Sequence, residues 1–437
     1  MTMWTSGVTK VDNQMLLTGV QQYSQTQHEP DWLQQLRQQA LQAYFNLPLP
    51  KFEKINYRDW PLFDFSVPSV LESEPVTGEL AKQAATQQFY AVGDSTIQLT
   101  LPMAALRQGV ILSDLRSAIT HHGDLVQKYL MQKALHVGDD KLTSLNTAMM
   151  TNGFFLYVPK NVQLEAPIEL LQIVDNRTTQ NYFSHNLLIA DSGSQVNVIQ
   201  RLASVGDQAN TAHVLVEVMA EANSQVNFAG IDTMSAQTTA YLNRRGYLAA
   251  DAKLDWEFAE MNAGNVIADF DSELKGRGSE AMVKTIAIAN QTQTQALDTR
   301  VTNYGKQTVA NIVQRGIILD AATLIFNGIG HIIKGAHGAK ANQENRLLML
   351  STKARGDANP ILLIDENDVE AGHAASVGRV DEQQMYYLLS RGIPKPVAER
   401  LVIRGFLAGV ITELRSQRLR QELNDVIERR LTDGQND

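Results

Sequence analysis

The sequence predicts a mainly β protein whose long central β region is flanked by helical segments at both ends. Three patterns lead to this prediction: a helical period near the N-terminus, a repeat of nearly 30 residues in the middle, and three helical patterns after residue 378. Two strands in each repeat indicate a β-solenoid, whose coils bury their inner faces against their neighbours. A β-sandwich with coincidental spacing is the alternative.

The N-terminal part, residues 1–150, begins with an amphipathic helical pattern. Apolar residues recur at helical spacing over 32–45, as on one face of a helix. Asp31 precedes this run and is the predicted N-cap. Shorter helical patterns occur at 103–106 and 124–135, so we expect a helical or mixed domain here.

The central part, residues 151–375, alternates apolar and polar residues in short runs separated by Gly, Asn, Asp and Ser, which is typical of strands. A small or polar corner residue followed by alternating apolar positions recurs at nearly constant intervals. The copies begin at Ser194, Ser224, Ala252, Ser279 and Gln307. Because five evenly spaced copies arise by chance less easily than two, the pattern favours the solenoid over the sandwich.

The C-terminal part, residues 376–437, carries three helical patterns. Asp381 is the predicted N-cap of the first, and the second and third cover 397–411 and 419–431. The face of the third pattern that we expect to be exposed carries five arginines: Arg415, Arg418, Arg420, Arg429 and Arg430. Such a face is usually solvated helix surface, and a docking surface is the alternative.

Composition excludes several classes of protein. The net charge of −9 without a basic block argues against nucleic acid as a partner. The chain begins without a continuous apolar segment, and no window reaches the roughly 20 apolar residues of a membrane span. We therefore expect neither a secretory signal nor a membrane segment. The absence of cysteine rules out disulfides and fits a cytoplasmic chain.

Histidines are the main candidates for chemistry, because the sequence has no nucleophile elbow, phosphate-binding loop or zinc motif. His331 and His337 flank Lys334 among several glycines; they could share a metal, but hydrogen-bonded histidines at tight corners are the simpler interpretation. His373 follows the carboxylate-rich run 365–370, which could keep its ring cationic or fix its tautomer. Since a metal site needs three or four ligands, His373 requires ligands from another chain.

Two other kinds of protein compete with a binding scaffold. A carbohydrate-active β-solenoid enzyme, a lyase or hydrolase, needs paired carboxylates on one face of the solenoid. Asp269 and Asp271 share a face, without an obvious partner from an adjacent coil. A self-contained flavin or metal protein is the other alternative, and no residues in the sequence can be assigned to it.

Four blocks, in their order and spacing, resemble the SufB/SufD family, the scaffold components of the Suf iron–sulfur cluster assembly system. These blocks are Ala341–Leu350, Ala358–Ile364, Asp368–Gly378 and Tyr386–Ile393. The N-terminal segment resembles the family's entry helix and acidic–aromatic motif more loosely, through Trp32, Arg37, Ala40, Phe45, Pro48, Pro50, Glu53 and Tyr57. Ile55 stands where that motif usually has tryptophan.

The resemblance implies a right-handed parallel β-helix with helical domains at both ends, which agrees with the three parts above. It points to the SufD branch, because the SufB branch is expected to offer a cysteine thiolate and a His-Glu pair. His373 matches the histidine of the SufD motif. Ala371 replaces the usual cysteine of that motif, and Ala374 replaces the usual glycine.

The resemblance also implies a non-catalytic subunit that pairs with a SufB-type paralogue through the β-helices and binds a SufC-type ATPase through the C-terminal helical domain. Tyr386, Tyr387, Arg391 and Phe406 are the candidate ATPase contacts. His373 would give one imidazole to a transient iron–sulfur cluster whose thiolate comes from SufB, or would instead close the β-helix end by hydrogen bonding. No intrinsic cofactor is expected, and flavin is possible but unassigned. Because a bare β-helix edge is a template for strand addition, we expect a homodimer when the chain is alone.

Overall fold

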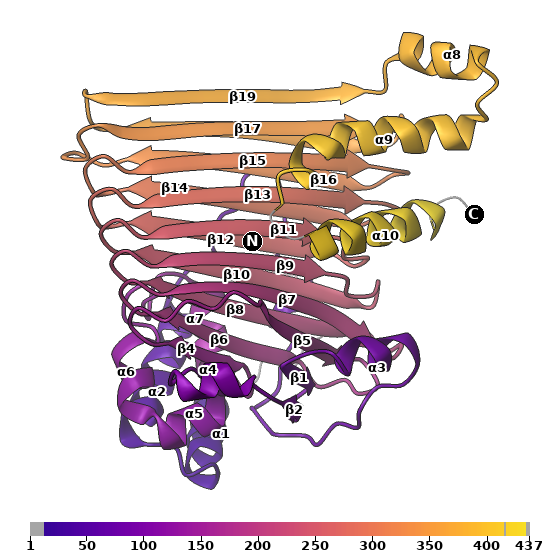
Figure 1. Cartoon of the computed structure of the whole chain (residues 1–437). Coiled ribbons are helices and arrows are strands. Elements are labelled where there is room, and N and C mark those ends of the chain that lie inside the picture. The colour runs from indigo at the N-terminus through magenta and orange to yellow at the C-terminus, as the bar shows by residue number, and fades with distance from the viewer. Residues whose placement is uncertain (1–12, 415–416, 434–437) are drawn as a thin grey trace, which may run out of the picture.

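The computed structural model describes residues 13–414 and 417–433. It is a parallel β-solenoid made of two long sheets, with helices at the N- and C-terminal ends of the chain (Figure 1). From β4 onward, consecutive strands lie in different sheets, and strands two apart in sequence are neighbours. The predicted solenoid is therefore confirmed and the β-sandwich alternative is wrong.

The two sheets are named A and B. From one edge to the other, sheet A contains β2 (Ser95–Leu99), β1 (Phe89–Val92), β5 (Ile168–Asp175), β7 (Gln195–Val205), β9 (Gln225–Asp232), β11 (Lys253–Glu260), β13 (Glu280–Ala289), β15 (Val309–Ile318), β17 (Ala339–Met349) and β19 (Val369–Arg379). Sheet B contains β3 (Ile111–Asp114), β4 (Phe154–Val158), β6 (Tyr182–Ala190), β8 (Asn210–Ala220), β10 (Thr238–Leu248), β12 (Val266–Leu274), β14 (Thr294–Asn303), β16 (Thr323–Ile332) and β18 (Arg355–Ile364). Only the β1–β2 and β3–β4 pairs of these two sheets, within the described residues, are antiparallel.

Helices precede and follow the solenoid. The N-terminal ones are α1 (Asn13–Thr26), α2 (Asp31–Asn46), the 3₁₀ helix η1 (Pro61–Phe63), α3 (Gly78–Ala84), α4 (Met103–Arg107), α5 (Leu115–His121), α6 (Gly123–Tyr129) and α7 (Lys141–Met149). The C-terminal ones are α8 (Glu382–Ser390), α9 (Lys395–Ile411) and α10 (Gln417–Asp433). The helix predicted at 124–135 ends early, at Tyr129. None of the helices in the described part of the chain is long and apolar enough to cross a membrane.

Two N-cap predictions have opposite outcomes. Asp381 caps α8, accepting hydrogen bonds from the backbone N–H groups of Gln383 and Gln384, as predicted. Asp31 is not the N-cap of α2, because Pro30 holds that position and Asp31 lies in the first turn. Its carboxylate still suits that turn, where the helix dipole favours negative charge.

The repeat seen in the sequence marks the corners where the chain enters sheet A. Each corner begins with a residue in the left-handed region, with φ between 55° and 71°: Gly193, Asn223, Asp251, Gly278, Gln307 and Gly338. The N–H of each donates to a carbonyl of the next coil at 2.7–2.9 Å. A small buried side chain follows in every case, namely Ser194, Ser224, Ala252, Ser279, Thr308 and Ala339. The fifth predicted copy was thus one residue early, because Thr308 and not Gln307 fills the buried corner.

Inward-facing side chains of both sheets form the core, which is apolar over most of its length. Trp256 is its largest member, 1% exposed. Arg244 is an exception: it is buried between the sheets and makes ion pairs with Asp232 at 2.8 Å and Glu260 at 3.2 Å. Burial and the nearby carboxylate of Asp232 raise the pKa of Glu260 well above its ordinary value, because both disfavour its charged form.

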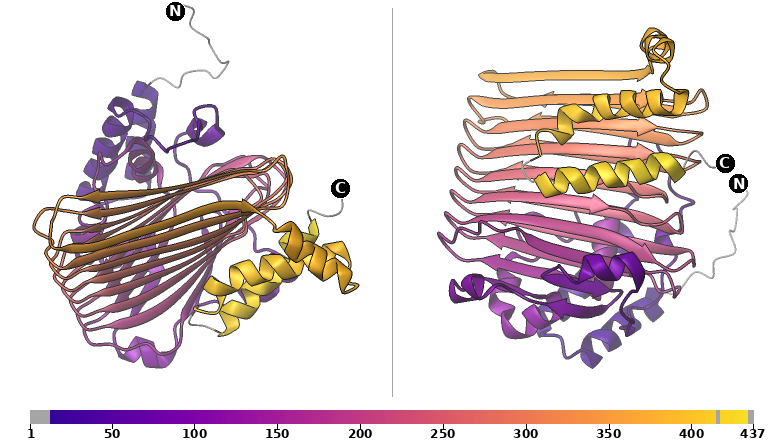
Figure 2. Two further views of the ribbon diagram at one scale, coloured as in Figure 1. Left: turned by 90° about the horizontal axis from the view of Figure 1, so that it is seen from above. Right: turned by 45° about the vertical axis from the view of Figure 1, so that its right-hand side comes forward.

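Helices α1, α2, α5, α6 and α7 lie against the outer face of sheet B (Figure 2), whereas α3 packs on sheet A. Arg37 of α2 is only 2% exposed and fixes this packing. It forms an ion pair with Glu29 at 2.7 Å and donates to the carbonyls of Ala148 and Met150 at 3.0 and 2.9 Å. Because Glu29 is also buried, this pair joins the first helices firmly to the end of α7.

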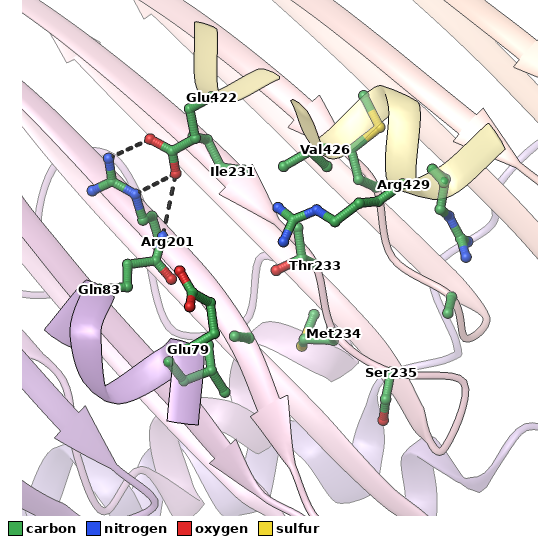
Figure 3. Close-up of a pocket in the computed structure, with 15 residues that line it drawn as sticks. Glu79, Gln83, Arg201, Ile231, Thr233, Met234, Ser235, Glu422, Val426 and Arg429 are labelled. Atoms are coloured by element: carbon green, nitrogen blue, oxygen red, sulfur yellow. Dashed lines mark hydrogen bonds and ion pairs between the residues drawn. The ribbon is translucent and has the colours of Figure 1, made fainter. Parts of the chain in front are cut away.

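The C-terminal helices α9 and α10 cover the outer face of sheet A through an apolar cluster that includes Ile231, Ile288, Leu407 and Val426. At one end of this contact, Arg201 of β7 makes two 2.7 Å bonds to the carboxylate of Glu422 on α10 (Figure 3). It also makes a 2.9 Å bond to Glu169. Burial opposes the charge of Arg201, but the two carboxylates raise its pKa above the ordinary value.

The arginine face predicted for the last helix is only partly solvated. Arg430 is half-buried and donates to the Asn262 carbonyl and to Gln293. Arg420 donates to the carbonyl of Thr412 at 3.1 Å, whereas Arg429 is exposed. Arg415 and the side chain of Arg418 lie outside the described residues.

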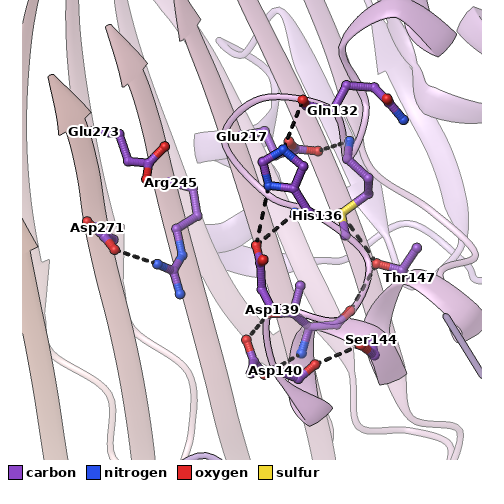
Figure 4. Close-up of polar contacts among 12 residues, drawn as sticks. Gln132, His136, Asp139, Asp140, Ser144, Thr147, Glu217, Arg245, Asp271 and Glu273 are labelled. Atoms are coloured by element: carbon purple, nitrogen blue, oxygen red, sulfur yellow. Dashed lines mark hydrogen bonds and ion pairs between the residues drawn. The ribbon is translucent and has the colours of Figure 1, made fainter. Parts of the chain in front are cut away.

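A polar cavity of about 340 Å³ lies where the N-terminal loops meet sheet B. Arg245 of β10 reaches into it and binds Asp269 at 2.5 Å and Asp271 at 2.8 Å. Figure 4 shows the pair with Asp271 and the loop that carries Asp139 and Asp140. The expectation that these two aspartates lack a carboxylate partner from an adjacent coil is wrong, because Asp298 of the next coil lies in register with Asp269. The sequence could not reveal the pairs, because the partners lie on neighbouring coils.

The next coil adds Asp298, which lies in register with Asp269. Burial raises the pKa of Asp298 to about 7, against a hydrogen bond from Asn327 that lowers it, and burial raises the pKa of Asp269 to about 6. Unfolding returns both groups to pKa values of about 4. The folded chain therefore binds more protons than the unfolded chain between about pH 4 and pH 7, and its stability falls as the pH rises through that window.

Replacing Asp298 with Asn removes this proton uptake and keeps an acceptor for Asn327. We expect D298N to exceed the wild type in unfolding free energy by about 4 kcal/mol at pH 8, three pKa units at about 1.4 kcal/mol each, and by only about 1 kcal/mol at pH 4.5. Chemical denaturation at both pH values measures the difference, and D207N, at an exposed position, is the control. An equal gain at both pH values would contradict the assignment.

The candidate site at the open end of the solenoid

The solenoid ends in a coil whose outward edge is bare. Strands β18 and β19 are the last strands of sheets B and A, and no further strand pairs with either within the described residues. Most of β19 is exposed, and the apolar side chains of Leu363, Ile364 and Val377 are 41–45% exposed. In Figure 1 this coil lies at the top, with α8 beyond it.

His373 lies in the middle of β19, in register with Gln343 of β17. Gln343 is 5% exposed and donates across the interior to the carbonyl of Ile361 at 2.9 Å, so it faces inward. In-register residues of neighbouring strands lie on the same face, roughly 4.8 Å apart. His373 therefore continues an inward-facing column, and it is exposed because no coil covers it.

The carboxylates expected to hold His373 have other partners. Glu370 binds Lys340 at 3.0 Å, and Asp365 lies 3.3 Å from His331. Within the described part of the chain, the ring of His373 makes no hydrogen bond, so the structure leaves its nitrogens available. Ala371 lies above the buried Ala341, and its methyl group offers no ligand.

The other histidine candidates do not share a site. His337 lies 3.5 Å from Glu366, whereas His331 contacts Asp365. The interpretation of these two as hydrogen-bonded histidines near corners agrees with this geometry. No group of three or more His, Asp or Glu residues that could hold a metal occurs in residues 13–414 and 417–433.

Three of the four candidate ATPase contacts lie on or next to α8, which buries none of its side chains. Tyr386 and Tyr387 are 75% and 57% exposed, and the guanidinium of Arg391 lies 5.1 Å from the ring centre of Tyr387. Phe406 differs, because it is half-buried on α9 and packs toward sheet A, with Arg315 5.9 Å from its ring centre. Of the four candidate contacts, therefore, Tyr386, Tyr387 and Arg391 form an exposed aromatic and cationic surface, and Phe406 does not belong to it.

Sequence reasoning missed Arg201 and Glu422, which secure α10 to the solenoid. They are 221 positions apart, so no local spacing could have revealed the pair. The available signal was the single charged residue of this strand, Arg201.

Comparison with known proteins agrees with this architecture. The SufBD protein N-terminal region matches residues 15–170, and the SUF system FeS cluster assembly, SufBD core domain matches residues 173–406. The chain is 40% identical over 422 residues to the iron–sulfur cluster assembly protein SufD of Bacillus subtilis (strain 168), which covers 94% of this chain and 96% of that protein.

More distant relatives have the same extent. The chain is 24% identical to a SufBD family protein of Staphylococcus haemolyticus (strain JCSC1435) and 25% identical to one of Staphylococcus epidermidis (strain ATCC 12228 / FDA PCI 1200). Each match spans 413 residues, 90% of this chain and 88% of the relative. The chain therefore belongs to the SufB/SufD family of iron–sulfur cluster assembly proteins, as a SufD-type member.

Proposed function

We propose that this chain is the non-catalytic SufD-type subunit of a cytoplasmic SufBCD scaffold, in which it pairs with SufB and binds the ATPase SufC. The observation that carries the proposal is the bare last coil, which presents His373 together with an unpaired strand edge in each sheet. An edge of this kind adds strands from another chain, and its exposed apolar side chains favour burial on pairing.

SufC binds, in this proposal, to the surface formed by Tyr386, Tyr387 and Arg391. Tyrosine and arginine are the residue types that contribute most to binding at protein interfaces. Helix α8 lies beyond the last coil (Figure 1), so an ATPase bound there stays close to the SufB-pairing end. Movement of the ATPase could then be transmitted to the pairing edge through α9, which packs on β13 and β15.

His373 supplies one imidazole to an iron–sulfur cluster while the cluster is assembled as cargo. Imidazole and thiolate are both ligands of iron in proteins. Because this chain has no cysteine, the thiolates come from SufB. The proposal includes neither flavin, for which no residue can be named, nor carbohydrate chemistry, because Asp269 and Asp271 are both engaged by Arg245.

Replacement of His373 with Ala tests the ligand role in the purified three-protein complex. We expect the yield of assembled cluster, measured by visible absorption and iron content, to fall at least about tenfold, since even lost outer-shell partners of metal ligands cost 10–100-fold. The complex should keep its composition. H337A, at a corner of the preceding coil, is the control, and a normal cluster yield from H373A would overturn the ligand role.

The docking surface is tested with Y387A and R391E. Either change should weaken binding of the isolated ATPase by about 30-fold, the effect of losing roughly 2 kcal/mol at an interface hot spot. Titration calorimetry measures the affinity. R107E places the same charge reversal on α4 at the opposite end of the solenoid and should bind like the wild type; full affinity of both docking variants would rule out this surface.

The pairing edge is tested on the isolated chain by light scattering. We expect the wild type to be a homodimer and V377K to be a monomer, because the substitution places a charge on the apolar end of β19. I97K makes the same change at β2, the other edge of sheet A, where the native side chain is similarly exposed at 37%, and should remain dimeric. A monomeric wild type at every concentration would contradict this expectation.

A further inference from the structure

The two strand edges of the last coil differ in the backbone groups that they offer to a partner. Along a strand, the N–H and C=O groups of successive residues point to opposite sides. The N–H of Arg355, at the start of β18, donates to the carbonyl of Ala322 at 3.0 Å. The N–H of Asp365, just after the end of β18, donates to the carbonyl of Ile332 at 2.9 Å. The even-numbered residues between them therefore face the open side, and Pro360 is one of these.

Pro360 interrupts the open edge of sheet B. Proline has no backbone N–H, and Pro360 lies in the middle of the row that faces outward, between Ala358 and Leu362. Proline and charged side chains on an edge strand both hinder the addition of a further strand. Strand β18 has both features, because Arg355 and Asp357 form an ion pair at 2.7 Å near its start.

The open edge of sheet A has an unbroken row of backbone groups. The N–H groups of Lys340 and Leu350 donate to carbonyls of the preceding coil at 2.8 and 2.9 Å, so the odd-numbered residues of β17 face β19. In a parallel pair, a residue that faces its neighbour bonds to the two residues flanking its register partner, and the register partner faces away. Because Gln343 is in register with His373, the backbone groups of His373 and Ala375 point to the open side.

Strand β19 is also long and nearly uncharged. It has 11 residues, and from Ala371 to Gly378 it contains no proline, lysine, arginine, aspartate or glutamate. At the opposite end of the solenoid, the edge strands β2 and β3 have five and four residues, and short edge strands discourage pairing. Of the four strands at the two ends, β19 is thus the one that is long, uncharged over most of its length and free of proline.

We propose that the partner pairs with this chain through a continuous backbone ladder on β19, whereas β18 meets the partner through side chains alone. The inference rests on the proposed pairing at the last coil and adds which strand makes it. The partner that fits is a second solenoid whose end strand is of similar length and equally free of proline and charge.

This pairing has a consequence for His373. Because its backbone groups point to the open side, the partner strand runs directly beside it, and residues that face each other in paired strands lie roughly 5 Å apart. A ligand on the partner strand then lies within reach of the same cluster as His373.

Two matched proline substitutions test which edge is used. Ala375 of β19 and Ala358 of β18 both lie in end strands with the N–H on the open side, so neither substitution removes a hydrogen bond of the solenoid itself. We expect A375P to weaken pairing with SufB and with a second copy at least tenfold, because a carbonyl of the partner loses its donor. A358P should pair like the wild type.

Titration calorimetry with SufB and light scattering over a concentration series measure both kinds of pairing, and circular dichroism checks that each variant is folded. Pairing of A375P at wild-type strength, or equal weakening by A375P and A358P, would overturn the assignment to β19. A wild type that pairs neither with SufB nor with itself would refute the pairing at the last coil as a whole.

Hydrogen exchange of the wild type measures the same ladder without a substitution. When SufB is added to the chain diluted to a monomer, the peptide covering 369–379 should gain slowly exchanging N–H groups. The peptide covering 355–364 should gain none, because exchange slows where the N–H is held in a hydrogen bond. Equal protection of the two peptides would contradict the proposal.

Discussion

The in-register stacking of parallel coils is the constraint on which the rest of this molecule depends. Because each residue lies directly above its counterpart one coil below, the inner face of a coil is covered only by the next coil. Stacking therefore gives every strand a paired neighbour on both sides, except the strands at the two ends. At the last coil the same rule leaves backbone groups, apolar side chains and His373 uncovered, so the site is a direct consequence of where the repeat stops.

Arginines join the helical parts to this stack. Arg37 fixes the first helices to the end of α7, and Arg201 and Arg430 hold α10 on sheet A. Each bonds to carboxylates or carbonyls from a distant segment, for which the planar guanidinium with its five donors is suited. Apolar contacts thus hold the helices against the solenoid, and arginine contacts fix where the helices lie on it.

The two exposed surfaces, the last coil and helix α8, differ in how they are packed. The interior of the stack is packed down to the last coil, whereas α8 buries none of its side chains and extends past that end. In the proposed complex, a partner on α8 would therefore lie next to a partner at the strand edge while contacting none of the core. In the same complex this chain, which has no cysteine, would supply geometry and SufB would supply the thiolates.

The sequence by itself determined the features that depend on local spacing. The repeat with its buried corner residues, the three C-terminal helices and the Asp381 cap are set by periodicity and by neighbours within a few positions, as are the motifs that resemble the family. The tertiary structure alone decided the partners of Asp269 and Asp271, the half-buried position of Phe406 and the Arg201–Glu422 pair. These depend on how coils and helices stack, which brings together residues from distant parts of the chain that no local pattern relates.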